Sequence, residues 1–150
     1  MSVSELDAIG GRLLVIYDGH CGLCNRSVRW FLRHDQRDRM RFADSESPKV
    51  GELLERHGLS RAASAMGPNT ILVVREPGGS DEQVLIRSDA ILALLGELPR
   101  PWPAVGTALR WIPRPVRDLG YRLVARWRYR VWGRLDTCPL PTAEERARFL

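Results

Sequence analysis

Few local patterns limit the topology of a chain as much as two cysteines placed where a buried strand gives way to a helix. Residues 13–17 (LLVIY) form a short apolar run that ends at Asp18 and Gly19, which predicts a buried strand and a turn. From Cys21 onward, apolar residues recur with helical spacing at Cys24, Val28, Phe31 and Leu32. The other face of this helix is expected to carry Asn25, Arg26, Arg29 and Arg33. The two cysteines therefore occupy the first turn of a helix that directly follows a strand.

The remaining elements of the first two thirds alternate in the same manner. The expected strands are residues 40–44, 70–74 and 84–86, of which 70–74 (TILVV) has the strongest signal. The expected helices begin at Pro48 after a Ser47 cap, and at a Ser88 cap with an end at Leu95. The predicted order over residues 12–96 is β-α-β-α-β-β-α, which is an α/β sandwich.

A chain of 150 residues has room for one domain. We expect residues 1–96 to form its core and residues 97–150 to form a helical, arginine-rich extension packed on that core. Prolines divide this extension into a short helix near residues 104–112 and a longer one at about 115–132. A core-facing stripe is expected on the longer helix at Val116, Leu119, Leu123, Val124, Trp127 and Val131.

The positive charge is concentrated in the extension. Residues 101–150 carry a net charge of +6, whereas residues 1–100 carry −1. Arg122, Arg126 and Arg130 recur every four residues on a second side of the longer helix. This row could be a solvated face, or it could bind an acidic protein or an anionic membrane surface. Nucleic acid is the partner class that the pattern favours least.

The location of the cysteines predicts different acidities for the two thiols. Unpaired amides and the positive end of the helix dipole favour a thiolate at Cys21. Cys24, one turn deeper on the apolar stripe, is expected to stay protonated and to be less accessible. This asymmetry predicts thiol-disulfide exchange, in which Cys21 attacks and Cys24 resolves the mixed disulfide.

Two neighbouring residues are candidates for tuning this protonation. His20 could stabilise the Cys21 thiolate or move protons, or it could be a solvated residue of a polar turn. Asp18 could accept a proton from Cys24, but Asp-Gly is also an ordinary turn sequence. Both alternatives stay open for both residues.

Other functions of the cysteines are compatible with the pattern. Cys21 and Cys24 could be inert core residues, or they could bind zinc together with His20 and the distant Cys138. Cys138 could instead pack or form a regulatory disulfide. We expect no tightly bound cofactor. The chain starts without the basic and apolar segments of a secretory signal and has no apolar run of membrane-spanning length, so a cytoplasmic location is expected.

Residues 17–35 (YDGHCGLCNRSVRWFLRHD) resemble the signature of the DCC family of predicted thiol-disulfide oxidoreductases, named for one aspartate and two cysteines. The corresponding residues here are Asp18, Cys21 and Cys24. Further segments that resemble the family are residues 86–92, 113–134 and 138–150. The resemblance implies a thioredoxin-like fold and names no substrate. For a dithiol oxidoreductase we expect protein or small-molecule disulfides or thiols as partners. The main alternative is a metal-binding module that uses Cys21 and Cys24, and a second is an interaction protein that uses the basic helix, with the dithiol as a redox sensor.

Two further expectations come from thioredoxin-like proteins in general. These proteins usually place a cis-proline just before the third core strand, and the nearest candidate here is Pro68, two residues before Thr70. The helix start at Ser88 and Asp89 is similar to the place where glutaredoxins hold glutathione. Glutathione is therefore an expected co-substrate there, although a plain serine cap explains the same residues.

Overall fold

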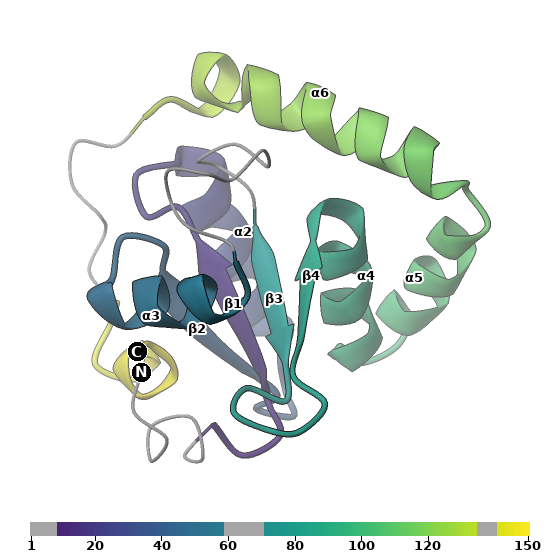
Figure 1. Ribbon diagram of the computed structural model, residues 1–150. Coiled ribbons are helices and arrows are strands. Elements are labelled where there is room, and N and C mark those ends of the chain that lie inside the picture. The colour runs from purple at the N-terminus through teal and green to yellow at the C-terminus, as the bar shows by residue number, and fades with distance from the viewer. Residues whose placement is uncertain (1–8, 59–70, 135–140) are drawn as a thin grey trace.

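The computed structural model describes residues 9–58, 71–134 and 141–150. A four-stranded sheet runs through the molecule (Figure 1). Its strands are β1 (Leu13–Tyr17), β2 (Met40–Asp44), β3 (Leu72–Arg75) and β4 (Gln83–Ile86). They are arranged in the order β2-β1-β3-β4, with β1 parallel to β2, and with β3 antiparallel to both β1 and β4.

Helices cover both faces of this sheet. The helices of the described residues are α2 (Gly22–His34), α3 (Pro48–Arg56), α4 (Arg87–Glu97), α5 (Trp102–Arg110), α6 (Arg114–Trp132) and the short 3-10 helix η1 (Glu145–Arg148). From β1 to α4 the order is the predicted β-α-β-α-β-β-α. The predicted thioredoxin-like α/β fold is therefore confirmed, while the division of the chain at residue 96 stays a prediction.

The central position of β1 explains its uninterrupted apolar sequence. Successive side chains of a strand point to opposite faces, so alternate residues of β1 enter two different cores. Leu13, Val15 and Tyr17 pack with α2 and α4, whereas Leu14 and Ile16 pack with α3. All five residues are buried. The buried strand therefore fixes the position of the turn that follows Tyr17, at the carboxyl end of β1.

The last helices extend the core on one side. α5 packs against α4, and α6 crosses the ends of α4 and α2 (Figure 1). The predicted core-facing stripe on α6 is wrong, because its six apolar side chains are 49% to 63% exposed. Asp118 and Arg128 are buried instead. Near its end, α6 meets the polar β1–α2 turn, where Arg128 and Tyr129 contact Asp18, and these contacts turn the six apolar side chains outward. No helix of the described residues is long and apolar enough to cross a membrane.

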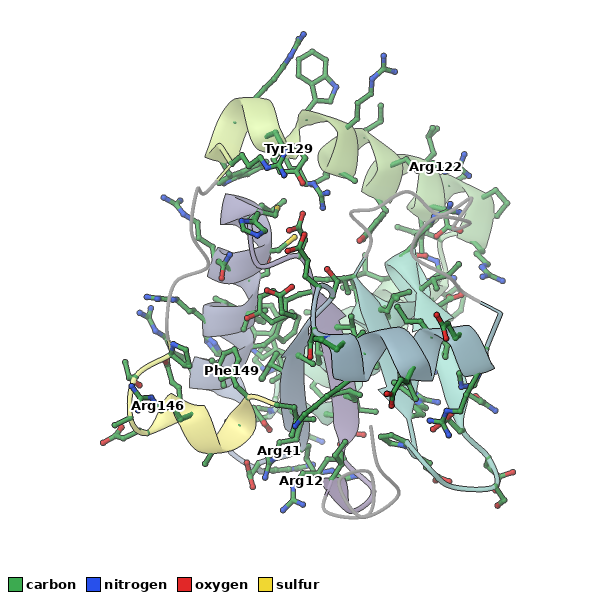
Figure 2. All side chains as sticks on the ribbon, turned by 60° about the vertical axis from the view of Figure 1, so that its left-hand side comes forward. Arg12, Arg41, Arg122, Tyr129, Arg146 and Phe149 are labelled. Atoms are coloured by element: carbon green, nitrogen blue, oxygen red, sulfur yellow. The ribbon has the colours of Figure 1, made fainter. Side chains whose placement is uncertain are left out.

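The end of the chain returns to the free edge of β2, which the sequence did not predict. The Leu150 amide donates to the Phe42 carbonyl at 2.9 Å, and Phe149 forms a parallel bridge with Phe42. The ring of Phe149, which is labelled in Figure 2, contacts the rings of Phe42 and Tyr17. Arg148 pairs with the buried Asp35 at 3.4 Å. An edge strand covered in this way is protected from pairing with other chains.

Candidate active site

The two cysteines lie at the junction that the sequence predicted. Cys21 is the N-cap residue of α2 and has extended backbone angles, with φ −85° and ψ 119°. Its sulfur accepts a hydrogen bond from the Cys24 amide at 3.3 Å. A serine or aspartate oxygen commonly makes this bond at a helix start. At this site a sulfur makes it, so an otherwise unpaired helix amide points at the Cys21 thiol.

Side-chain hydrogen bonds hold the turn before the motif. The Asn25 amide group donates to the carbonyl oxygens of Gly19 at 2.6 Å and Cys21 at 3.0 Å. Asn25 is buried, so its expected place on the exposed face of the helix is wrong. The Asp18 carboxylate accepts from the His20 amide at 2.9 Å. These bonds fix the position of Cys21 relative to the axis of α2.

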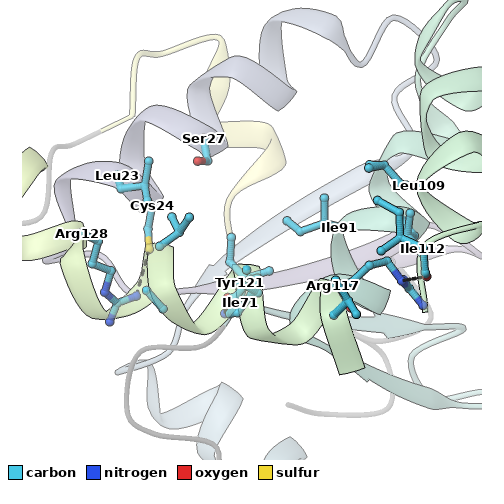
Figure 3. Close-up of a pocket in the computed structure, with 16 residues that line it drawn as sticks. Leu23, Cys24, Ser27, Ile71, Ile91, Leu109, Ile112, Arg117, Tyr121 and Arg128 are labelled. Carbon is cyan, nitrogen blue, oxygen red and sulfur yellow. Dashed lines mark hydrogen bonds between the residues drawn. The ribbon is translucent and has the colours of Figure 1, made fainter. Parts of the chain in front are cut away.

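α6 contributes a buried cation to the site, and the sequence did not predict it. Arg128 is only 2% exposed, and its Nη1 lies 3.6 Å from Cys24 Sγ (Figure 3). Its Nη2 lies 3.8 Å from Asp18 Oδ2 and 3.2 Å from the Tyr129 hydroxyl. The Tyr129 hydroxyl donates to Asp18 Oδ2 at 2.7 Å. Asp18 thus joins the turn before the motif to α6, 111 residues further along the chain.

The surroundings give the two thiols opposite acidities. The Cys24 thiol donates to Cys21, and together with the Cys24 amide and the Arg128 charge it lowers the pKa of Cys21 to about 6, against burial and Asp18. The same thiol bond, together with burial and the negative Cys21, raises the pKa of Cys24. This order of acidity agrees with the predicted one. The largest cause of the lowered pKa of Cys21 is the hydrogen bond from the Cys24 thiol, and the amide at the helix start is a smaller one.

The end of α6 covers the motif. Cys21 is 0% exposed and Cys24 is 6% exposed, so the expectation that Cys21 is the more accessible thiol is wrong. Gly133 has a φ of 75°, which ends α6, and its carbonyl accepts from the Gly22 amide at 3.3 Å. A Cβ on Gly22 would lie 2.5 Å from the Trp132 carbonyl oxygen. The glycine of the motif therefore permits the close approach that buries Cys21.

The His20 side chain contacts Glu46, whereas the sequence predicted that it could act on the Cys21 thiolate. Its Nε2 lies 3.4 Å from Glu46 Oε2, and its side chain is partly exposed. A role of His20 in protonating the thiols stays a prediction. The same holds for Asp18 as a proton acceptor, since its carboxylate receives Tyr129 and faces Arg128.

Ser88 and Asp89, which the sequence predicted to bind glutathione, both contact residues of α6. Ser88 lies in the first turn of α4, whose N-cap is Ile86, so the predicted serine cap is wrong. The Ser88 hydroxyl donates to Asp118. Asp89 pairs with Arg114 at 3.0 Å and with Arg117 at 3.5 Å. Glutathione binding at Ser88 and Asp89 stays a prediction, and it would require a ligand to displace Asp118.

An apolar cavity of about 520 Å³ lies between α2, α4, α5 and α6. Cys24 and Arg128 line one end, and Arg117 and Leu109 line the other (Figure 3). Its walls are mostly aliphatic, and its volume lies in the range of small-molecule sites. The sulfur of Cys24 is therefore reached by an apolar space as well as by Arg128.

The zinc and proline predictions each include a residue outside the part of the chain that the structure describes. Cys138 and Pro68 lie outside the described residues. Within residues 9–58, 71–134 and 141–150, no group of three or more histidine, cysteine, aspartate or glutamate side chains is arranged to hold a metal ion.

Comparison with known proteins places the whole site within one region of similarity. The sequence model of the DCC1-like thiol-disulfide oxidoreductase family matches residues 15–134, which include the CxxC motif and all of α6. A DCC family protein of Arabidopsis thaliana, described as chloroplastic, is 33% identical over 129 residues, or 86% of this chain and 70% of that protein. The protein YuxK of Bacillus subtilis (strain 168) is 28% identical over 137 residues, or 91% of this chain and 93% of its own. No solved structure matches the chain.

Proposed function

The chain belongs to the DCC1-like thiol-disulfide oxidoreductase family, and we propose that it exchanges disulfides through Cys21 and Cys24. The observation that carries this proposal is the hydrogen bonding at the motif. Cys21 Sγ accepts from the Cys24 amide at 3.3 Å and from the Cys24 thiol, which favours a thiolate at Cys21. A thiolate with a pKa below that of free cysteine is present at neutral pH and attacks disulfides.

The proposed reaction has two steps. In the reducing direction, the Cys21 thiolate attacks one sulfur of a client disulfide, so that the client S–S bond breaks and a Cys21–client disulfide forms. The displaced client sulfur takes a proton from solvent. Cys24 then releases its proton to solvent, and its thiolate attacks the Cys21 sulfur. The Cys21–client bond breaks, the Cys21–Cys24 disulfide forms, and the released second client sulfur takes up a proton. Two electrons pass to the client, and the reverse steps oxidise a client dithiol.

Arg128 supports the second step of this proposal. Cys24 carries a thiol with a raised pKa, so it needs a nearby positive charge when it ionises. Arg128 Nη1 lies 3.6 Å from its sulfur. Asp18 and Tyr129 hold this guanidinium, so we assign them as positioning residues. His20, beside Glu46, is proposed to adjust protonation from the other side of the turn.

Access to the dithiol requires a local movement in this proposal. Cys21 is fully buried beneath the end of α6. A client sulfur must approach Cys21 in line with the bond that breaks, so residues 132–134 move outward before the attack. The apolar cavity beside Cys24 favours client disulfides that carry apolar groups over polar ones such as glutathione, which stays a second proposal at Ser88 and Asp89. A cytoplasmic location is likewise a proposal.

The test compares wild type with Cys21→Ser, Cys24→Ser and, as a matched control, Cys138→Ser. We expect wild type and Cys138→Ser to reduce a protein disulfide substrate in the presence of a dithiol reductant. Cys24→Ser should accumulate a mixed disulfide with the substrate, and Cys21→Ser should not. If Cys21→Ser forms the mixed disulfide instead, the assigned roles are wrong. Stoichiometric zinc in freshly purified protein, lost in both motif variants, would favour the metal-binding alternative.

A further inference from the structure

An exposed apolar ridge runs along the outer side of α6. We define the α6 ridge as Val116, Leu119, Leu123, Trp127 and Val131, each about half exposed. The helical spacing of three or four residues places them on one side of the helix. Trp111, which lies just before the start of α6, is 87% exposed. An exposed apolar surface of this extent commonly marks an interaction site.

The ridge cannot turn inward, because the opposite side of α6 is committed to the core and the active site. Asp118 accepts from Ser88, and the Tyr121 hydroxyl accepts from the Ile71 amide at 3.0 Å. Near the other end, Arg128 and Tyr129 contact Asp18. Rotation of the helix would break these contacts along its whole length. The outward orientation of the ridge is therefore part of the fold.

A row of arginines accompanies the ridge. α6 contains six arginines and one acidic residue, and that residue, Asp118, is buried. Arg122, Arg126 and Arg130 are exposed, and their spacing of four residues places them along one flank of the ridge. None of the three forms an ion pair with a residue of the described ranges. The guanidinium of Arg130 lies 5.2 Å from the centre of the Trp127 ring.

We propose that α6 binds the surface of an anionic phospholipid bilayer, with its axis in the plane of the membrane. The ridge would enter the boundary of the acyl chains, and the arginine row would contact the lipid phosphates, which guanidinium groups bind well. Tryptophan side chains such as Trp127 and Trp111 favour this interfacial depth. A flat bilayer matches a continuous ridge of about 23 Å, from Val116 to Val131, without requiring a shaped partner surface.

This orientation would place the dithiol close to the membrane. Arg128 projects from the inner side of α6, so the motif lies about one helix diameter, roughly 10 Å, from the lipid-facing side. Val116 and Val124 are half exposed and also line the cavity that reaches Cys24. The apolar cavity is therefore continuous with the surface that we assign to the membrane.

The first test measures co-sedimentation with vesicles. We expect the full chain to bind vesicles of equal parts phosphatidylglycerol and phosphatidylcholine, to bind pure phosphatidylcholine weakly, and to be released by high salt. The triple variant Arg122→Gln/Arg126→Gln/Arg130→Gln should bind about a hundredfold more weakly, since each surface cation contributes about a factor of five. The matched control is Arg26→Gln/Arg29→Gln/Arg33→Gln on α2, which makes the same charge change and should bind as wild type. Equal loss in both triple variants would overturn the assignment to α6.

The second test concerns the apolar ridge and its alternative occupant, a second copy of the chain. Leu119→Gln/Leu123→Gln should weaken vesicle binding by about tenfold or more, because the leucines no longer enter the bilayer. Both side chains are half exposed, so thermal unfolding of this variant should match that of wild type. A stable dimer of wild type that becomes monomeric in this variant would overturn the proposal. Cys21→Ser should bind vesicles as wild type does. A loss of redox activity can therefore be distinguished from a loss of membrane binding.

Discussion

Arg128 is the residue that most changes the chemistry expected of the motif. A buried arginine is costly unless its charge is paired and its N–H groups are hydrogen-bonded. Here Asp18, Tyr129 and Cys24 surround the guanidinium. Its positive charge lowers the pKa of both cysteines. The same arrangement therefore stabilises whichever sulfur is ionised during disulfide exchange.

Replacing this charge should weaken the Cys21 thiolate. In Arg128→Met, which keeps much of the side-chain volume, the pKa of Cys21 is expected to rise above about 6, because a stabilising charge is lost while burial remains. Ultraviolet thiolate absorbance titration measures this pKa in the reduced protein. Arg126→Met, an exposed arginine on the same helix, is the control. An unchanged titration curve in Arg128→Met would mean that the charge has no part in activating Cys21.

Asn25 and Gly22 show how sequence position misleads at the scale of single residues. Asn25 looks like part of a polar helix face, yet it bonds the carbonyl oxygens of Gly19 and Cys21. Gly22 looks like a spacer between two cysteines, yet it allows the end of α6 to approach. Asn25 and Gly22 each lie against backbone carbonyl groups, and the positions of these groups depend on the fold.

At the scale of elements, the contact between the start of α2 and the end of α6 determines whether the motif is covered. Gly22→Ala would introduce a Cβ at 2.5 Å from the Trp132 carbonyl oxygen, so the end of α6 must move. We expect a loss of about 1 to 3 kcal/mol in the free energy of unfolding. We also expect faster alkylation of Cys21 by iodoacetamide, because its cover is displaced.

The matched control for this substitution lies within α6. At Gly120 an added Cβ meets no heavy atom within 4 Å. Gly120→Ala should therefore keep the slow alkylation of wild type and stabilise the protein by up to about 1 kcal/mol, through helix propensity. If Gly22→Ala is as stable and as slowly alkylated as Gly120→Ala, the close contact with Trp132 does not limit access.

The chain end and β2 form a second element contact that can be tested. Phe149→Ala removes a partly buried ring that contacts Phe42 and Tyr17. We expect it to lower the free energy of unfolding by about 2 kcal/mol, below the cost for a fully buried ring. Chemical denaturation gives this value. Leu150→Ala, at an exposed neighbouring position, should change stability by less than about 1 kcal/mol, and similar losses in both variants would argue against the ring contacts.

At the scale of the whole molecule, the acidity of Cys21 connects the site to global stability. Its folded pKa of about 6 lies below the reference value of 9.0, so the native thiolate stabilises the fold. The contribution of the Cys21 thiolate to the free energy of unfolding is complete above pH 9. It decreases as the pH falls from 9 to about 6, and it is absent below pH 6. The raised pKa of Cys24 acts in the opposite sense and disfavours the fold above its unfolded pKa.

The reduced protein should therefore gain stability between pH 6 and pH 9, relative to a variant without the acidic thiol. The expected slope of the difference between wild type and Cys21→Ser is at most about 1.4 kcal/mol per pH unit, for one proton. Urea unfolding of both proteins in the presence of a reductant measures this difference. A difference that stays constant over the range would show that Cys21 titrates alike in the folded and unfolded chains.

The active site is assembled across the whole molecule from two distant segments. The turn after β1 supplies Asp18, Cys21 and Cys24, and α6 supplies Arg128 and Tyr129 more than 100 residues later. The periodicity of α6 by itself predicts the wrong buried face. The β1–α2 turn beneath the end of α6 pairs with Arg128, and the contacts of Asp118 and Tyr121 fix the rest of the helix, so Leu119 and Leu123 are exposed.

The strand and helix order, the position of the dithiol and the order of the thiol acidities followed from local sequence. They depend on apolar spacing, on turn residues and on the amides of a helix start, all of which lie within a few residues of one another. The cover over Cys21, the buried cation beside Cys24 and the outward ridge of α6 came only from the tertiary structure. Each of these depends on which surfaces meet after the chain has folded, and hydrophobic spacing within one helix carries no information about its distant partner.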